Sequence, residues 1–342
     1  MGKTSDILSM TITEIEELMI GINQPKYRAK QVWGWLHKNA AQSFENMVNL
    51  PSSLRTLLQE NYHIATVTTV EKLVSERDKT AKFLFALHDD ALIEAVFMEY
   101  AHGTSVCVST QVGCRMGCAF CASTQGGLTR NLTAGEMCAQ VYAVEKGAKV
   151  GGIVLMGCGE PLDNFDSTLR FIELITAKEG INIGQRHITL STCGLVPQIL
   201  ELAERKLQIT LAISLHAPTD EIRKQFMPIA KLYPLSDLIN ACKKYVQATS
   251  RRITFEYALA KGKNDSLAHA RELVKLLRGI NCHVNLIPIN KARDKYSGSS
   301  QKDISAFADI LQKGRIQTTV RRSLGSDVNA ACGQLRAGHK QG

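Results

Sequence analysis

The chain has 342 residues, of which 44% are hydrophobic and 21% are charged. These fractions are ordinary for a globular protein, and no apolar run approaches the roughly 20 residues that span a bilayer, so they argue against a disordered or membrane-spanning chain. The formal net charge of +9 at pH 7 favours a polyanionic partner such as nucleic acid, or a phosphorylated substrate.

The first residues, MGKTSDILSM, contain no apolar signal segment. We therefore expect a cytoplasmic protein, in which thiols stay reduced and cysteines serve metal or redox chemistry.

Residues 1–62 are expected to form a small helical domain that binds RNA. The predicted helices cover residues 11–22, 25–39 and 50–62. In the second helix, three apolar side chains recur at the spacing of a buried face: Val32, Trp35 and Leu36. The exposed basic side chains near its start are candidates for contacts with RNA phosphates: Lys26, Arg28 and Lys30.

Residues 63–105 are predicted to form a strand-rich linker. Alternation of apolar and polar residues marks strands at 65–74, 81–88 and 91–100. The charged residues 75–80 separate the first two strands and predict a turn.

Residues 107–130 read CVSTQVGCRMGCAFCASTQGGLTR and hold four of the ten cysteines. Cys114, Cys118 and Cys121 have C-x3-C-x2-C spacing, which suits an iron–sulfur cluster with one iron left open for chemistry. Structural zinc is the alternative, but zinc prefers paired C-x2-C units, and this loop has one such pair and an odd cysteine. With Phe120 before the last cysteine, the loop resembles the signature of the radical S-adenosylmethionine superfamily.

From residue 106 onward, short apolar strands alternate with amphipathic helices. The predicted strands cover residues 106–110, 151–157, 187–191, 209–214, 252–257, 283–288 and 317–322. The helix at 133–147 begins with a capping-box pattern at Thr133 and Glu136. This α/β alternation predicts parallel strands buried on both faces. Six or seven units are too few for a closed barrel of eight, so we expect residues 106–342 to form a partial (β/α)6 TIM-type barrel.

Ligands of such a barrel bind at the carboxyl ends of its strands. The residues predicted to bind a cofactor there are Gly159, Glu160, Ser191, Ser214, Leu215, His216 and Asn290. Glycine lets backbone approach a ligand, and the polar side chains suit an amino-acid head group and a ribose. A lone serine at a strand end is more often a helix cap. Glu160, between glycine and proline, has fewer structural uses.

Seven motifs spread over nearly the whole chain carry a closer resemblance: VCVSTQVGCRMGCAFCAST, GLTRNL, GEPLDN, STCGLVP, LAISLHAP, LIPIN and AACGQLR. In this order they resemble the bacterial ribosomal RNA adenine-C2 methyltransferases of the radical S-adenosylmethionine class. The resemblance implies methylation of C2 of adenine 2503 in 23S rRNA and, for many members, of adenine 37 in tRNAs. It also implies a [4Fe-4S] cluster, two S-adenosylmethionine molecules per turnover, and a reductant protein such as flavodoxin or ferredoxin. We expect a monomer.

The resemblance assigns two cysteines outside the cluster. Adenine C2 is a poor nucleophile, so Cys332 takes a methyl group from one S-adenosylmethionine, and a 5′-deoxyadenosyl radical from a second removes hydrogen from that methyl. The carbon radical adds to C2, and Cys107 then attacks the sulfur of Cys332, forming a disulfide and releasing the product. Glu94 matches the family's proton acceptor. However, a glutamate in an alternating strand usually faces solvent, and Cys107 could itself take the proton.

Some positions fall outside this scheme. The residues that depart from the family pattern are Cys158, Ala230 and Asn329, where relatives usually carry Met, Asn and Asp. The cysteines predicted to be small buried hydrophobes are Cys138, Cys193, Cys242 and Cys282. Further basic residues expected to contact RNA are Arg251, Arg252, Lys291, Arg293, Lys295, Arg321, Arg322, Arg336 and Lys340.

Three other interpretations compete. Methylation of C8 of the same rRNA adenine would share the cluster, Cys107 and Cys332, but the GEPLDN and STCG motifs favour the C2 activity. A radical enzyme acting on a small molecule would leave the two extra cysteines and the basic surface unexplained. A non-catalytic zinc-dependent RNA-binding module would contain zinc and no iron or sulfide.

Overall fold

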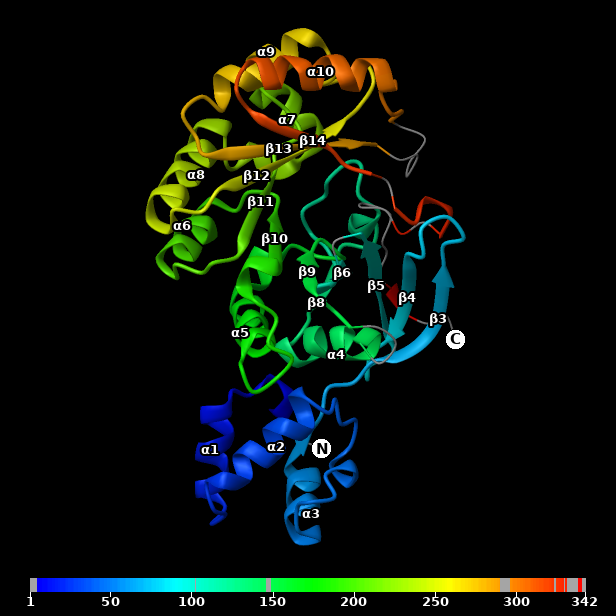
Figure 1. Cartoon of the computed structure of the whole chain (residues 1–342), viewed down its shortest axis with the longest axis vertical. Helices are drawn as coiled ribbons and strands as arrows, with labels where there is room; N and C mark the ends of the chain where they lie inside the picture. Colours follow the sequence, from blue (N-terminus) through cyan, green and yellow to red (C-terminus); the bar gives the residue numbers. More distant parts are fainter. Residues whose placement is uncertain are drawn as a thin grey trace.

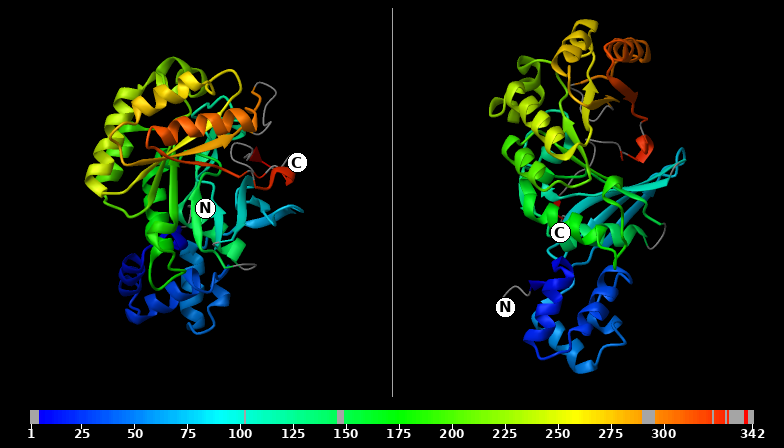
Figure 2. Two further views of the ribbon diagram at one scale, coloured as in Figure 1. Left: turned by 45° about the horizontal axis from the view of Figure 1, so that its top comes forward. Right: turned by 60° about the vertical axis from the view of Figure 1, so that its left-hand side comes forward.

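The computed structural model describes residues 5–101, 103–145, 149–289, 296–322, 324–328, 330 and 338–339. In these residues a small helical unit lies beyond one end of a large curved sheet, whose outer face is covered by helices (Figure 1). Figure 2 gives two further views, with the N-terminal helical unit in blue. No helix in the described part of the chain is long and apolar enough to cross a membrane.

The N-terminal unit contains the three predicted helices, which are confirmed as α1 (Ile12–Gly21), α2 (Tyr27–His37) and α3 (Ser52–Asn61). A capping box begins α1. The Thr11 hydroxyl accepts a hydrogen bond from the N–H of Glu14 (3.2 Å), and the Glu14 carboxylate accepts one from the N–H of Thr11 (2.6 Å). Two short strands, β1 (Ser5–Asp6) and β2 (Tyr62–His63), pair in parallel and bring the ends of the unit together.

One prediction for α2 is wrong. Val32 and Leu36 are fully buried as expected, but the buried tryptophan is Trp33, with 3% exposure, and not Trp35. Trp35 is half-buried, and its Nε1–H donates to Asn49 Oδ1 at 2.6 Å. A tryptophan can cover apolar area while its single donor is satisfied near the surface, and apolar spacing does not distinguish this arrangement from full burial.

The main sheet contains a run of parallel strands that follow one another in chain order. They are β6 (Gly103–Cys107), β9 (Gly152–Leu155), β10 (Ile188–Thr192), β11 (Thr210–Ser214), β12 (Ile253–Leu259), β13 (Cys282–Pro288) and β14 (Gln317–Val320). The helices that connect them are α4 (Ala134–Glu145), α5 (Phe165–Thr176), α6 (Val196–Glu204), α7 (Asp220–Phe226), α8 (Leu235–Thr249), α9 (Leu267–Leu276) and α10 (Gln301–Lys313). The predicted α/β partial barrel is confirmed.

Residues 68–100, predicted as part of a linker, continue the same sheet. Strands β3 (Thr68–Val74), β4 (Ala81–Ala86) and β5 (Ala91–Tyr100) pair antiparallel in order, and β5 pairs antiparallel with β6. The short β15 (Gly338–His339) also pairs with β5. The antiparallel strands therefore extend the sheet beyond the first barrel strand, and β5 pairs with β4, β6 and β15.

The remaining elements are short. A hairpin is formed by β7 (Gln111–Gly113) and β8 (Leu128–Asn131). The 3-10 helices are η1 (Ile7–Ser9), η2 (Phe44–Asn46), η3 (Ala122–Thr124), η4 (Pro161–Asn164), η5 (Gln185–His187), η6 (Pro228–Lys231) and η7 (Ser326–Val328). The residues between β7 and β8 include the three cysteines of the C-x3-C-x2-C motif.

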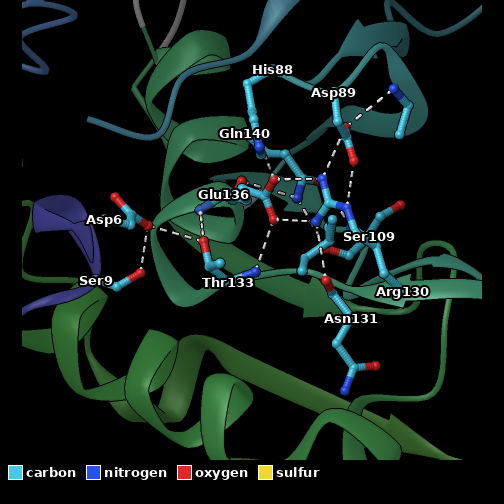
Figure 3. Close-up of polar contacts among 12 residues, drawn as sticks. Asp6, Ser9, His88, Asp89, Ser109, Arg130, Asn131, Thr133, Glu136 and Gln140 are labelled. Atoms are coloured by element: carbon cyan, nitrogen blue, oxygen red, sulfur yellow. Dashed lines mark hydrogen bonds and ion pairs between the residues drawn. The ribbon is translucent and has the colours of Figure 1, made fainter. Parts of the chain in front are cut away.

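The N-terminal unit is joined to the barrel at the start of α4, where Figure 3 shows the contacts. The predicted capping box is confirmed, since Thr133 Oγ1 accepts from the N–H of Glu136 at 3.0 Å and the Glu136 carboxylate accepts from the N–H of Thr133 at 2.9 Å. The Thr133 hydroxyl also donates to Asp6 at 3.0 Å, and the N–H of Gly135 donates to Ser9 Oγ at 2.8 Å. Asp6 and Ser9 of the N-terminal unit therefore hydrogen-bond to the first residues of α4 in the barrel.

Arg130 in β8 contacts two further elements in the same view (Figure 3). Its guanidinium donates to both oxygens of Glu136 in α4, at 2.8 Å each. It also donates to both oxygens of Asp89, in the turn between β4 and β5, at 2.7 and 3.0 Å. These hydrogen bonds hold the pKa of Asp89 at about 2. One cation thus connects the hairpin, the first barrel helix and the antiparallel strands.

His37, at the end of α2, makes a second contact with α4 that should respond to pH. Its Nδ1 lies 2.7 Å from the Tyr142 hydroxyl, and burial lowers its pKa to about 3. An unfolded histidine titrates near 6.5, so below that pH the unfolded state binds the additional proton and stability falls. We expect this residue to reduce the free energy of unfolding by up to about 1.4 kcal/mol per pH unit as the pH drops below about 6.5.

Urea denaturation at about pH 7 and pH 5 measures this loss. The His37→Gln protein should lose less stability than the native chain between the two pH values, whereas His187→Gln, which alters an exposed histidine, should lose the same amount. Equal losses in the native and His37→Gln proteins would contradict the assignment.

Candidate active site

A cavity opens at the carboxyl ends of the parallel strands. Its empty space, including the solvent-open mouth, is about 1030 Å³. The predicted site residues that line it are Cys114, Cys118, Cys121, Gly159, Glu160, Ser191, Ser214 and His216. Residues from separate loops and strand ends therefore surround one cavity.

The cysteine loop is held at both ends by backbone hydrogen bonds. At its base the N–H of Cys114 donates to the carbonyl of Gly127 at 2.8 Å. Gly113 has a φ of 79°, and a Cβ there would collide with the same Gly127 carbonyl, so only glycine fits. Farther along, the N–H of Ala119 donates to the carbonyl of Phe226, at the end of α7, at 2.8 Å. The ligand loop is therefore fixed against both the hairpin and α7.

The donor set of this loop fits a cluster. Among the described residues, no three His, Cys, Asp or Glu side chains are arranged to hold a single metal ion. A cubane cluster makes a different demand, because each thiolate binds a separate iron. Burial raises the pKa of Cys114 to about 12 and also raises that of Cys118. These thiols would release their protons on binding iron. Because the loop supplies three thiolates, one of the four irons of a [4Fe-4S] cluster would have no ligand from the loop.

Glu160 is buried in the loop after β9 and is held by backbone groups. Its N–H donates to Gln111 Oε1 at 2.8 Å, and its carboxylate accepts from the N–H groups of Leu162 (3.1 Å) and Cys193 (2.7 Å). Burial raises the pKa of Glu160. The side chains of Thr192 and Cys193 also hydrogen-bond to this carboxylate. Glu160 lines the cavity, where its charge can attract a cationic ligand.

Steric constraints explain why the residue before Glu160 is a glycine. Gly159 has a φ of 110°, and a Cβ at this position would lie 2.6 Å from Thr110 Oγ1 and 2.8 Å from the backbone nitrogen of Gln111. Both the backbone conformation and the close approach of the loop after β6 therefore require glycine.

The two serines lie on the inner face of the sheet. Ser191 of β10 is opposite Ala212 in β11, and Ser214 follows Ala212 by two residues, so the two hydroxyl-bearing side chains point to the same side. Leu215 is different, because its side chain is fully buried in the core and does not line the cavity. Its backbone N–H donates to the carbonyl of Glu256 at 3.0 Å, and its carbonyl accepts from Arg223 Nε at 3.3 Å.

His216 is held as a neutral hydrogen-bond donor. Its Nδ1 accepts from the N–H of Ala258 at 3.0 Å, which leaves the proton on Nε2. Burial, with a smaller effect of the positive charge of Arg223, lowers its pKa to about 3. The residue has a φ of 57°, its carbonyl accepts from Asn264 Nδ2 at 2.7 Å, and its ring packs edge-on against Phe120 at 4.9 Å.

Cys107 and Glu94 do not line the cavity but lie on the neighbouring strands β6 and β5. Cys107 is opposite Val154 of β9 and therefore faces the same side of the sheet as Met156, two residues later, which lines the cavity. The buried Cys107 packs in one apolar cluster with Met156 and Ala330. Met156 thus belongs both to the cavity lining and to the apolar cluster around Cys107.

Glu94 is buried, contrary to the usual position of a glutamate in an alternating strand. Its carboxylate lies 2.9 Å from Lys82 Nζ, and its carbonyl accepts from the Ser109 hydroxyl at 2.6 Å. Glu94 precedes Val96, the residue opposite Cys107, by two positions, so Glu94 and Cys107 share a face of the sheet. The predicted residues that lie outside the described part of the chain are Cys332, Asn290, Asn329, Lys291, Arg293, Lys295, Arg336 and Lys340.

Several cavity residues were missed by the sequence analysis. Glu256 of β12 is buried, lines the cavity, and accepts from Asn285 Nδ2 at 2.9 Å. Its signal was a single carboxylate in the middle of a largely apolar strand. Arg321, predicted to contact RNA, and Cys193, predicted to be a buried hydrophobe, also line the cavity. Cys158 is fully buried behind it.

Two family models match the sequence. The one described as the Radical SAM superfamily matches residues 108–277, and the one described as the Ribosomal RNA large subunit methyltransferase N-terminal domain matches residues 5–64. The first covers the cysteine loop and the strands around the cavity, and the second covers the helical unit.

Known proteins are similar over nearly the full length. A probable dual-specificity RNA methyltransferase RlmN of Clostridium novyi is 53% identical over 334 residues, which are 97% of each chain. Its counterpart in Alkaliphilus oremlandii is 52% identical over 339 residues, or 98% of each chain. The crystal structure of a radical SAM methyltransferase from Sphaerobacter thermophilus superposes with a TM-score of 0.92 at 44% identity, covering 97% of this chain and 99% of the other.

Proposed function

Since the chain belongs to the RlmN family of dual-specificity RNA methyltransferases in the radical S-adenosylmethionine superfamily, we propose that it methylates C2 of adenine 2503 in 23S rRNA and of adenine 37 in tRNAs. One observation carries the proposal. Cys107, outside the cluster loop, packs beside Ala330, which precedes Cys332 by two residues in the sequence. In the proposed route to an unreactive ring carbon, one thiol carries the methyl group and a second thiol releases the product.

Members of the superfamily use a [4Fe-4S] cluster and S-adenosylmethionine, which supply one-electron chemistry and a methyl group when bound. In this chain Cys114, Cys118 and Cys121 would hold the cluster. Glu160 would accept hydrogen bonds from the ammonium group of S-adenosylmethionine. The neutral His216 would donate a hydrogen bond to an acceptor atom of the same molecule. The other residues proposed to bind this molecule are Gly159, Ser191, Ser214, Asn290 and the backbone of Leu215.

The two catalytic cysteines would act in sequence. The Cys332 thiolate attacks the methyl carbon of one S-adenosylmethionine, forming a sulfur–carbon bond as S-adenosylhomocysteine leaves. Once that carbon is bonded to C2, the Cys107 thiolate attacks the sulfur of Cys332. The disulfide forms, the sulfur–carbon bond breaks with its electron pair going to carbon, and a proton completes the methyl group. A thiol reductant must then reduce the disulfide.

Glu94 is proposed to accept the proton that leaves C2. It shares a sheet face with Cys107, and its ion pair with Lys82 fixes the direction of the carboxylate. A base placed on the strand next to the resolving cysteine would be near the same carbon atom.

RNA and a reductant are the proposed partners of a cytoplasmic monomer. Residues 1–62 would form an RNA-binding accessory domain, residues 63–105 an extension, and residues 106–342 the catalytic barrel. Near the start of α2, Lys26 and Lys30 are exposed, and the Arg28 guanidinium lies over the Tyr27 ring at 5.0 Å. A cationic surface with an exposed aromatic ring suits phosphates and bases of unpaired RNA. A small acidic electron carrier such as flavodoxin or ferredoxin would reduce the cluster.

Nucleoside analysis tests the proposal and its rival. A strain without its own enzyme for this adenine should gain 2-methyladenosine in 23S rRNA and tRNA when this chain is expressed. Formation of 8-methyladenosine would support the C8 activity instead, and unmodified RNA together with zinc-containing, iron-free protein would support the binding module.

The methyl-carrier role predicts a modified C-terminal peptide. Mass spectrometry of protein made in cells should find one methyl group on Cys332, because the first transfer does not require RNA. In a Cys114→Ala protein the modification should be lost if the cluster site binds the methyl donor. Unmodified Cys332 in protein that holds its cluster and has been supplied with S-adenosylmethionine would exclude the role.

A further inference from the structure

A buried cation lies behind the cysteine loop with no carboxylate partner. Arg223, in α7, has 0% of its surface exposed. It forms no ion pair within the described residues, where the neighbouring acid Asp220 instead accepts from the N–H of Leu235 at 2.9 Å. Placing a charge in the protein interior without a counter-ion is strongly unfavourable. The charge of Asp220 acts on Arg223 without a direct ion pair, so a closer negative charge is to be sought in a bound group.

The guanidinium is held in place by backbone carbonyls alone. Its Nη2 donates to the carbonyls of Cys193 (2.7 Å) and Ser214 (3.3 Å), and its Nε donates to that of Leu215 (3.3 Å). These carbonyls lie at the ends of β10 and β11, next to residues that line the cavity. The remaining nitrogen, Nη1, is buried and has no hydrogen-bond partner. A neutral side chain with N–H groups could donate to the same carbonyls. Hydrogen bonding alone therefore does not explain why position 223 carries a positive charge.

Arg223 lies beside the cavity that the three cysteines of the loop line. Its hydrogen-bond partners Cys193 and Ser214 line the same cavity as Cys114, Cys118 and Cys121. The loop also touches the end of α7 directly, because the N–H of Ala119 donates to the carbonyl of Phe226 and the ring of Phe120 lies 6.1 Å from that of Phe226. Arg223 and the cysteine loop are thus parts of one packed unit.

We propose that Arg223 is the built-in counter-charge of the iron–sulfur cluster and raises its reduction potential. A cluster bound by three thiolates gains one more negative charge on reduction, and a fixed cation nearby stabilises that reduced state in a dry environment. Charge and hydrogen bonding around the cysteine sulfurs are among the factors that set cluster potentials. Arg223 is a positioning residue in this proposal, since it acts through the cluster and contacts no substrate. The proposal rests on the cluster and is independent of which RNA carbon is methylated.

Redox titration of the reconstituted holoenzyme tests the charge directly. The reduced cluster is followed by electron paramagnetic resonance while an anaerobic sample with mediators is titrated with dithionite, without RNA. In Arg223→Gln the midpoint should fall by at least 59 mV, which is a tenfold change in the one-electron equilibrium. Arg223→Lys keeps the charge and should stay close to the native value. Arg205→Gln, which removes an exposed arginine paired with Glu201 on α6, should match the native enzyme.

Each outcome decides the proposal. A native midpoint in cluster-loaded Arg223→Gln overturns it, because a purely structural arginine would alter stability and leave the potential unchanged. Should Arg223→Gln fail to load a cluster, as judged by iron and sulfide content, Arg223→Met provides a second neutral variant. If neither loads, Arg223→Lys decides alone: a native midpoint supports the counter-charge, and a drop of 59 mV or more despite the retained charge overturns it.

Discussion

Replacing Cys107 with alanine should stop the enzyme with RNA covalently attached to it. Every step before product release uses Cys332, the cluster and S-adenosylmethionine, so the bond between the carrier carbon and adenine C2 still forms. No thiol is then available to attack the sulfur of Cys332, and the adduct persists. The buried Cys107 is small and packs with Val96 and Met98 on one face of the sheet. Its replacement by alanine therefore costs about 1 kcal/mol of stability.

The adduct can be measured without assaying turnover. Protein purified from cells should migrate as a ribonuclease-sensitive, slower band in a denaturing gel, and turnover should fall below detection. Cys242→Ala is the matched control, because Cys242 is equally buried but lies in α8, and it should yield free protein with near-native activity. The double variant Cys107→Ala, Cys332→Ala should also be free of RNA. Free protein from the single variant would refute the resolving role of Cys107.

The sequence was most informative where short-range spacing determines the chemistry. The C-x3-C-x2-C motif needs only its own loop to be recognised, and the strands before Glu160 and Ser191 were visible as short apolar runs. Because parallel strands end at a common rim, their order along the chain was enough to bring these residues to one cavity. The partial barrel was predictable for the same reason.

Tertiary contacts decide the features that the sequence did not reveal. Alternation in residues 68–100 predicted strands, but pairing of β5 with β6 is a long-range contact that no local pattern specifies. Leu215 follows a cavity residue, yet the turn of the chain at this strand end directs its side chain into the core. The burial of Arg223 is a similar case. Most residues of α7 are polar or charged, and the packing of α7 against the ends of β10 and β11 encloses Arg223.

Glu160→Gln should weaken S-adenosylmethionine binding by about tenfold to 150-fold, because a hydrogen bond to a charged group contributes about 1.5 to 3 kcal/mol. The substitution keeps the shape of the side chain and removes its negative charge. One end of the carboxamide must also present an N–H₂ donor to a backbone N–H, of either Leu162 or Cys193, where the carboxylate now accepts. Some loss of stability is therefore expected together with the loss of affinity.

The two effects can be separated by measuring Kd and stability on the same preparations. Anaerobic equilibrium dialysis of cluster-loaded protein gives the Kd for S-adenosylmethionine, and urea denaturation gives the free energy of unfolding. Glu201→Gln, an exposed carboxylate on α6, should change neither quantity. If Glu160 only ties the loop after β9 to the loop after β10, Glu160→Gln should lower stability and leave Kd within about twofold of the native value, a change of under about 0.5 kcal/mol. If it also binds the ammonium group, Kd should rise even where the protein is fully folded, because the lost charge acts on the ligand directly.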